Sequence, residues 1–85
     1  MNKSCEVIMG ERIYRRIESE ISNYYETYKI KPNYIILGSS EYELLEAINE
    51  NLPKLEINNK KIFDIQFEIK EDDMGFKIGY MREIN

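Results

Sequence analysis

The stretch that decides the fold, residues 32–45, reads PNYIILGSSEYELL. Pro32 ends any helix before it, because the residue ahead of a proline is pushed out of the helical region. The apolar run from Tyr34 to Leu37 is typical of a strand that is covered on both faces. Gly38 then permits a sharp turn into a following helix. The stretch therefore predicts a strand that leads directly into a helix.

Polar residues mark the predicted start of that helix. Ser40 and Glu43 have the S-x-x-E spacing of a capping box, in which each side chain accepts a hydrogen bond from the other residue's amide. Ser40 is interpreted as a helix cap rather than a nucleophile, since the glycine that a nucleophile elbow needs after its serine is missing. Pro53 ends the helix, so the strand-to-helix unit runs from Pro32 to about Asn51.

A longer helix is predicted before Pro32, over residues 11–28. Its apolar side chains recur at helical spacing, and neither glycine nor proline interrupts it. Residues 1–10 are interpreted as a short lead-in, and residues 11–85 as one domain. The stripe expected to face the core comprises Ile13, Ile17, Ile21, Tyr24 and Tyr28.

Alternating apolar and polar residues predict strands in the second half. Residues 54–57 could form a short strand, and the two asparagines that follow are typical of a turn. The alternation from Phe63 to Ile69 predicts a strand with one buried face. A similar alternation over residues 76–80 predicts a second strand, which we expect to pair antiparallel with the first across a polar turn at residues 71–75.

The predicted fold class is therefore α+β, in one small domain. The order is helix, strand, helix and then a β-hairpin, with two helices packed on a central sheet. The 85 residues have room for one domain and too few residues for two.

Composition excludes several kinds of function. Twelve basic and sixteen acidic residues give a net charge of −4, which argues against a dedicated nucleic-acid binder. The chain has no apolar run long enough to span a membrane and no signal-peptide pattern, so we expect a soluble, cytoplasmic protein. With one cysteine and no histidine, conventional zinc sites and histidine-activated nucleophiles are excluded. We expect no cofactor, no metal and no catalysis.

Acidic residues gather at two places. Three consecutive acids at residues 71–73 do not supply the six or more oxygens that calcium binds, so a plain turn is expected there. The acids of the second helix are interpreted as a solvated face. Alternatively, both groups could form an acidic surface that covers a basic site on a partner. This alternative face comprises Glu43, Glu46, Glu50, Glu71, Asp72 and Asp73.

Tyrosine and arginine gather on the predicted first helix, and both are favoured at protein interfaces. Because Tyr24 and Tyr28 fit the core stripe and glutamates lie among the arginines, a core face with a solvated opposite face is the simplest interpretation of this helix. The alternative is a docking surface on its exposed side. An exposed sheet edge near residues 76–81 is another place where the chain could dock or self-associate, although Lys77 and Arg82 could equally protect that edge. The residues chosen for the helix surface are Arg12, Tyr14, Arg15, Arg16 and Tyr25.

The long helix followed by PNYIILGSSEYELL resembles a segment of tailed-phage major capsid proteins and encapsulins. In that family a spine helix leads to a proline, an apolar strand, a polar turn and an axial-domain helix with paired leucines. Residues 62–67 stand where the family has a later strand, and residues 74–79 are similar to its closing strand. The likeness covers residues 11–81, but Asp64 and Gln66 stand where the family has glycine and proline.

The resemblance implies a stand-alone capsid-type domain of phage or mobile-element origin, with an assembly or structural role and no catalysis. The leading hypothesis is a non-enzymatic protein that acts through contacts with a protein partner and could also form homo-oligomers. The alternative is a small acidic inhibitor, of the anti-defence or immunity type, that binds a basic site on its partner.

Overall fold

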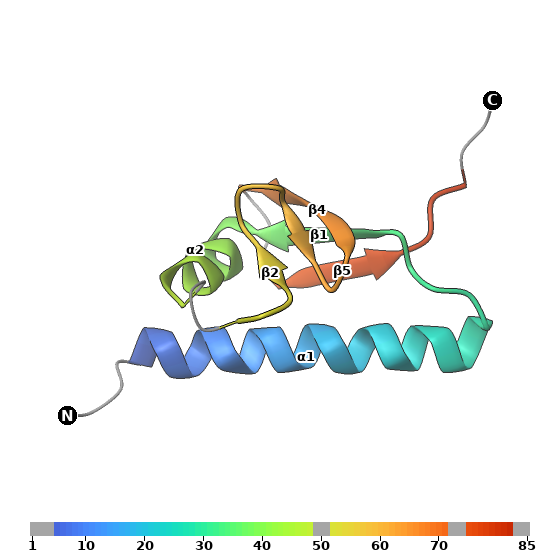
Figure 1. Cartoon of the computed structure of the whole chain (residues 1–85), viewed down its shortest axis with the longest axis horizontal. Helices are drawn as coiled ribbons and strands as arrows, with labels where there is room; N and C mark the ends of the chain where they lie inside the picture. Colours follow the sequence, from blue (N-terminus) through green and yellow to red (C-terminus); the bar gives the residue numbers. More distant parts are fainter. Residues whose placement is uncertain (1–4, 49–51, 72–74, 83–85) are drawn as a thin grey trace.

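The computed structural model describes residues 5–48, 52–71 and 75–82, and Figure 1 shows their arrangement. Five strands form one sheet, and two helices pack on it. The elements in chain order are α1 (Cys5–Tyr28), β1 (Tyr34–Gly38), α2 (Ser39–Ala47), β2 (Leu55–Glu56), β3 (Lys61–Ile62), β4 (Ile65–Lys70) and β5 (Phe76–Gly79). The α+β class and the order of the main elements agree with the sequence prediction.

The sheet has the strand order β2-β3-β4-β1-β5. β1 runs parallel to β4, with Ile35 opposite Phe67, and antiparallel to β5, with Ile35 opposite Ile78. β2, β3 and β4 form an antiparallel meander. The strand that the sequence placed first in the sheet therefore lies between two strands from the C-terminal half.

The expected hairpin between β4 and β5 is wrong, because β1 separates these two strands. The two are antiparallel to each other in direction, but each makes its hydrogen bonds with β1. Five residues connect Lys70 to Phe76, and their extended reach of about 17 Å exceeds the roughly 10 Å across one intervening strand. The connection is thus long enough to leave room for β1, whose apolar side chains gain a neighbour on each edge.

The β3–β4 turn also differs from the prediction. The alternating run from Phe63 does not form one strand, because Phe63 and Asp64 have φ angles of 52° and 66° and make a two-residue turn between β3 and β4. Positive φ at both central residues is the mark of a type I′ hairpin. From Ile65 onward the prediction is confirmed, since the odd-numbered side chains of β4 are turned to the buried side and the even-numbered ones are exposed.

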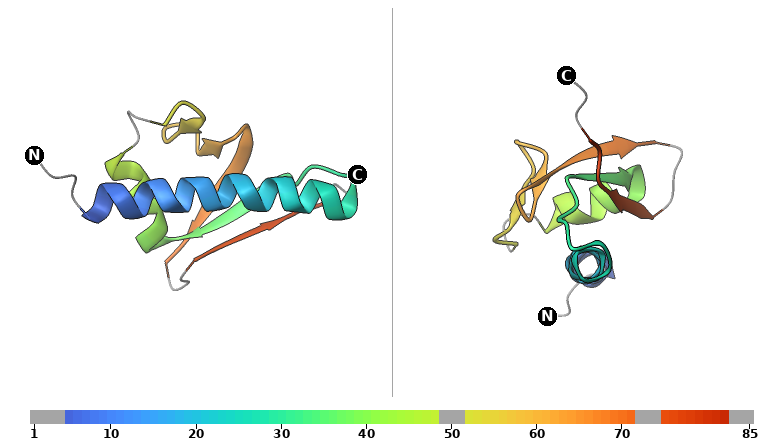
Figure 2. Two further views of the ribbon diagram at one scale, coloured as in Figure 1. Left: turned by 90° about the horizontal axis from the view of Figure 1, so that it is seen from below. Right: turned by 90° about the vertical axis from the view of Figure 1, so that its right-hand side faces the viewer.

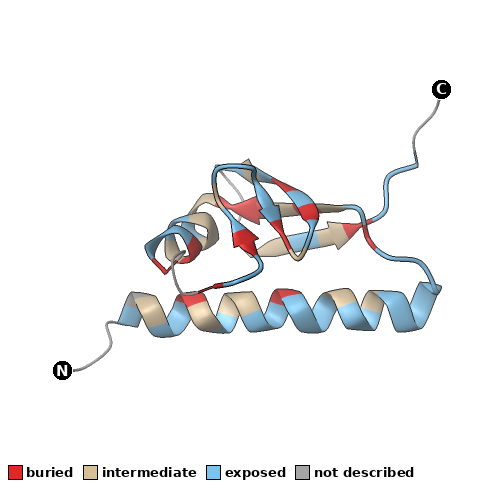
Figure 3. Cartoon of the chain, in the orientation of Figure 1, coloured by how far each residue is buried: buried red, intermediate tan, exposed pale blue. Residues whose placement is uncertain are grey.

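Both helices cover the same face of the sheet (Figure 2). The buried residues, coloured red in Figure 3, lie mainly on both helices and on the strands of the sheet. Neither of the two described helices lies on the opposite face. The prediction that β1 is covered on both faces is therefore wrong: Ile35 and Leu37 are fully buried, whereas Tyr34 and Ile36 remain half-buried. The core comprises Ile17, Ile35, Leu37, Leu45, Ile48, Leu52, Leu55, Ile62, Ile65 and Phe67.

Helix α1 begins at Cys5, so it includes six residues that the sequence analysis assigned to a lead-in. Its predicted stripe is confirmed at Ile17, which is fully buried, and at Ile21 and Tyr24, which are half-buried. The prediction that Tyr28 faces the core is wrong, because this residue is 61% exposed. The 24 residues of α1 span about 36 Å, whereas a strand of six residues spans about 20 Å. The last turn of α1 thus extends past the sheet (Figure 1).

Helix α2 starts without the predicted capping box. Gly38 is its N-cap, no side chain caps the helix, and Ser40 lies exposed inside the first turn. Gly38 also makes no special turn, since its φ of −69° and ψ of 157° are ordinary extended values. Because α2 begins two residues earlier than the capping box predicted, with Gly38 instead of Ser40 at the N-cap, Ser40 lies too far into the helix to cap it. The hydroxyl of Ser39 instead donates to the carbonyl oxygen of Glu71, at 3.2 Å.

The two helices approach each other most tightly at Gly10. A Cβ atom at this position would lie 2.7 Å from the carbonyl oxygen of Leu44 and 2.8 Å from Cδ1 of Ile48. The first of these neighbours is backbone and cannot rotate away. Gly10 is therefore the residue that lets α1 lie directly against α2.

We expect Gly10→Ala to lower the free energy of unfolding by about 1 kcal/mol or more. Overpacking costs about 1–3 kcal/mol, and the fixed backbone oxygen 2.7 Å away places this site in the upper part of that range, from which the better helix propensity of alanine subtracts at most about 1 kcal/mol. Urea denaturation followed by circular dichroism measures the change. Ser19→Ala, on the exposed side of the same helix, is the control and should change stability by no more than about 0.5 kcal/mol. Equal stability of Gly10→Ala and the unmodified chain would contradict the tight crossing.

Candidate interaction surfaces

The solvent side of α1 carries a basic patch on an acidic chain. Arg12, Arg15 and Arg16 are all exposed. Residues three and four positions apart lie on one side of a helix, so the three guanidinium groups share one face. Ile8 and Met9 are also exposed, at 41% and 50%, in the turn that precedes the arginines. We call these five residues the arginine patch.

Arg16 differs from the other two arginines. Its guanidinium carbon lies 5.7 Å from the ring centroid of Phe76, within the range of a cation–π contact. It therefore ties α1 to the edge strand β5 while keeping an exposed position. Arg12 and Arg15 are the members of the patch best placed to meet a partner.

The structure separates Tyr14 from the arginines with which the sequence grouped it. Tyr14 is half-buried, its ring lies 4.7 Å from the ring of Phe63, and its hydroxyl accepts a hydrogen bond from the amide of Lys54 at 3.2 Å. Burial raises the pKa of this hydroxyl, the bond from Lys54 lowers it in part, and the charge of Glu18 adds to the rise. Tyr14 holds α1 against the β2–β4 meander and does not belong to the arginine patch.

Tyr25 is also apart from the arginines. It lies ten residues beyond Arg15, which is about 15 Å along the helix. Tyr25 is 49% exposed, and the other large hydrophobic side chains that are exposed near it in the chain are Tyr28 and Ile30. The five residues chosen from the sequence are thus divided among a basic patch, a structural contact and an apolar end of α1.

The acidic residues of the alternative surface are only partly described. Glu43 and Glu46 are exposed on the outer side of α2, and Glu71 is exposed at the end of β4. Tyr42 lies beside this group and donates its hydroxyl hydrogen to Glu46; burial, and then the charge and hydrogen bond of Glu46, raise the pKa of Tyr42. Three further members, Glu50, Asp72 and Asp73, lie outside the described residues.

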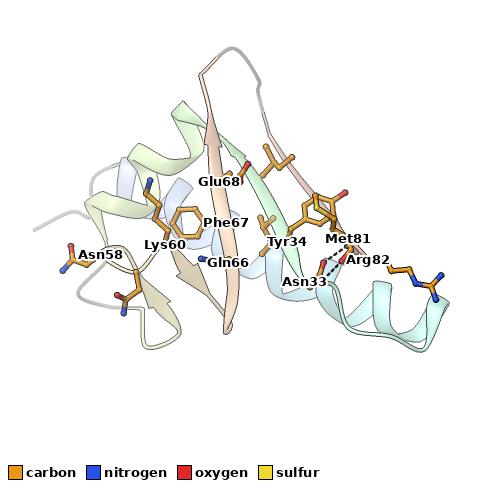
Figure 4. Close-up of a pocket in the computed structure, with 12 residues that line it drawn as sticks. Asn33, Tyr34, Asn58, Lys60, Gln66, Phe67, Glu68, Met81 and Arg82 are labelled. Atoms are coloured by element: carbon orange, nitrogen blue, oxygen red, sulfur yellow. Dashed lines mark hydrogen bonds between the residues drawn. The ribbon is translucent and has the colours of Figure 1, made fainter. Parts of the chain in front are cut away.

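The uncovered face of the sheet holds a surface that the sequence analysis missed. A concavity of about 810 Å³ runs across β1 and β4, with residues 58–60 on one side and residues 81–82 on the other (Figure 4). Tyr34, Gln66 and Glu68 are among the side chains that line it. The alternation of apolar and polar residues in β4 indicated that one face of the sheet is exposed. The apolar run of β1, however, suggested that both faces are covered.

Asn33 fixes one end of this concavity. Its side chain accepts a hydrogen bond from the amide of Met81 at 2.7 Å and donates one to the carbonyl oxygen of Met81 at 2.8 Å, as Figure 4 shows. The backbone N–H of Asn33 donates to the carbonyl oxygen of Gly79 at 2.9 Å. The chain after β5 therefore stays extended along β1, with the Asn33 side chain in the role of a backbone partner.

The described residues contain neither a cluster of metal ligands nor a helix that could span a membrane. No three histidine, cysteine, aspartate or glutamate side chains there gather closely enough to hold a metal ion. Neither described helix combines the length and apolar character needed to cross a membrane. Cys5 is exposed at the start of α1.

Comparison with known proteins returns no match: no protein-family model, no curated protein and no solved structure is similar to the chain. An inference about function therefore has to rest on the surfaces described above.

We expect Tyr14→Phe to lower the free energy of unfolding by about 0.5–1.5 kcal/mol, since it removes only the hydrogen bond to Lys54. Tyr14→Ala also removes the contact with Phe63 and should cost about 1.5–3 kcal/mol. Chemical denaturation measures both. Tyr25→Ala, half-exposed on the same helix, serves as the control and should cost no more than about 0.5 kcal/mol. If Tyr14→Ala and Tyr25→Ala cost the same, Tyr14 does not anchor the helix.

Proposed function

We propose that this protein is non-enzymatic and acts by binding another protein through the arginine patch of α1. The observation that carries the proposal is the exposure of Arg12 and Arg15 next to two exposed apolar side chains, Ile8 and Met9. Arginine combines charge, planar hydrogen bonding and a stem that packs on apolar groups, and it is enriched where proteins bind one another. The partner surface that fits this patch is acidic with an apolar centre.

The net charge of the chain sharpens this choice of partner. A chain of net charge −4 is on average repelled by an acidic surface, and the arginine patch is a place where that repulsion is locally reversed. A partner with an acidic site would therefore be attracted in one orientation, since complementary charges steer encounter and penalise the wrong docking geometry. Binding through the patch should weaken as salt increases.

A finer version of the proposal is a capsid-related assembly or structural role in a phage or mobile element. Its support is the resemblance of residues 11–81 to the spine helix and axial-domain segment of tailed-phage capsid proteins. Under this version the acidic partner belongs to a virion or its assembly machinery. The identity of the bound partner tests this version separately from the surface used.

A second candidate is a small acidic inhibitor that covers a basic site on its partner. The observation in its favour is the exposure of Glu43 and Glu46 on the outer side of α2, with Glu71 exposed at the end of β4. The two candidates use different surfaces and opposite charges, so matched charge reversals separate them.

The test is capture of partners from the native host by the tagged protein, compared with Arg12→Glu/Arg15→Glu. We expect the double variant to reduce capture of the specific partner at least tenfold at low salt, because two attractive charges become repulsive. Lys31→Glu/Lys61→Glu changes the net charge equally, at exposed positions away from the patch and from the concavity, and should retain capture. Quantitative mass spectrometry of the eluates measures the ratios.

Two results would overturn the proposal. Equal loss with both double variants would show that only the net charge matters. Loss with Glu43→Lys/Glu46→Lys, but not with the arginine variants, would favour the acidic inhibitor. Circular dichroism of each variant checks that the fold is retained.

A further inference from the structure

β5 is an edge strand with a defined set of outward backbone groups. It pairs with β1 on one side, and among the residues that the structure describes no strand follows it in the sheet order. The carbonyl oxygens of Gly75 and Gly79 accept from β1 and from Asn33, so the backbone groups of odd-numbered residues are directed inward. Because these directions alternate along a strand, the N–H and C=O groups of Phe76 and Ile78 are directed outward.

The outward series continues beyond the end of the strand. The amide and carbonyl groups of Met81 bond inward to the side chain of Asn33, which holds residues 79–81 extended. The backbone groups of Tyr80 therefore follow those of Phe76 and Ile78 on the outer side. Tyr80 is also 45% exposed, although its side chain is large and largely apolar.

A groove runs along this edge on the helix side of the sheet. It has a volume of about 290 Å³ and lies between α1 and the helix-facing side chains of β5. Phe76 and Ile78 form one wall, and Tyr24 and Tyr28, whose ring centroids are 4.5 Å apart, belong to the other. In Figure 2, α1 runs alongside β5 at the side of the sheet away from β2 and β3.

We propose that the chain forms a two-fold symmetric dimer in which β5 pairs antiparallel with β5 of a second copy, with Ile78 opposite Ile78. The outward groups of Phe76, Ile78 and Tyr80 then bond to those of Tyr80, Ile78 and Phe76 in the second copy. The two sheets become one continuous sheet, and both α1 helices lie on the same face of it. This inference goes beyond the proposed function, because it concerns a different surface.

Side chains that face each other in this register are complementary. On the helix side, Ile78 meets Ile78 and Phe76 meets Tyr80, pairs of the kind that stabilise antiparallel strands. On the other side, Lys77 lies opposite Gly79, whose neighbour Tyr34 lies close above it: a Cβ at Gly79 would be 2.5 Å from Cζ of Tyr34. The ammonium group of Lys77 therefore meets the ring of Tyr34 in the second copy, which attracts a cation.

Charge decides between this register and the neighbouring one. A two-fold axis at Lys77 would place the two Lys77 side chains directly opposite each other, and like charges in that position destabilise strand pairing. It would also leave the outward groups of Tyr80 without partners from the second β5. A two-fold axis at Ile78 avoids both costs. The charge of Lys77 therefore does not prevent a second copy from pairing with this edge in that register.

The strength of the dimer follows from its size. A stable interface covers about 800 Å² on each partner, more than a strand edge of five residues supplies. The remainder has to come from the groove, which the second copy's Ile78 and Phe76 would close, and from the exposed end of α1. We therefore expect a weak dimer whose population rises with protein concentration.

Sedimentation velocity over a hundredfold range of concentration tests the dimer, and disulfide trapping tests its register. In a Cys5→Ser background, Ile78→Cys should form an intermolecular disulfide under mild oxidation, because opposite residues in a hydrogen-bonded pair have Cα atoms about 5.5 Å apart. Lys77→Cys, one position along the same strand, should crosslink at least tenfold more slowly. Non-reducing gel electrophoresis measures both rates.

Tyr80→Pro tests the edge without changing the bonds between β5 and β1. Proline removes an outward N–H, is tolerated where that group faces solvent, and should weaken self-association at least tenfold. A monomer at every concentration, equal trapping at positions 77 and 78, or unchanged association of Tyr80→Pro would overturn the proposal. A monomer that takes up an extended peptide at this edge would show that the occupant is another protein.

Discussion

The pairing of β1 with two distant strands is the constraint on which the rest of the structure depends. Ile35 and Leu37 are fully buried in the middle of the sheet, with β4 on one side and β5 on the other. An isolated central strand cannot satisfy its backbone groups, so the N-terminal half of the chain is incomplete until residues 65–79 have folded onto it. This arrangement also fixes the edges of the sheet, since β5 has no neighbour beyond it. Both the exposed edge and the concavity over β1 and β4 follow from the position of this one strand.

The length of α1 is the second determinant. A helix of 24 residues is longer than the sheet it covers, so its two ends have different surroundings. Near the N-terminal end, Gly10 brings α1 against α2, and the arginine patch faces solvent on the opposite side. At the other end, Tyr25 and Tyr28 extend beyond the sheet and remain exposed. One amphipathic helix thus supplies a core stripe, a basic surface and an apolar end.

The surfaces of the two proposals lie close to each other in the fold. Arg16 illustrates how closely they are connected, because it belongs to the arginine patch and also lies over Phe76 of the edge strand. If β5 pairs with a second copy, both arginine patches are carried on the same face of one sheet. A dimer would then present two basic surfaces to a partner, and two linked weak contacts bind more tightly than either alone.

The sequence by itself determined the main elements, and the tertiary structure decided their exact ends and their neighbours. Helical spacing identified α1 through Ile17, and alternation identified β4 through Ile65 and Phe67, because these patterns depend on which side of one element is buried. Strand order could not be read in this way, since the alternation of β5 is satisfied equally beside β4 or beside β1. Tyr28 shows the same limit, because its spacing places it on the core stripe but only the length of the sheet determines whether a core lies there. Ser40 matched a capping box, yet a difference of two residues in where α2 begins removed that role. The spacing of apolar residues indicates which side of a helix or strand is buried. It does not indicate which other segment covers that side, because that depends on contacts between residues far apart in the sequence, and these form only in the folded chain.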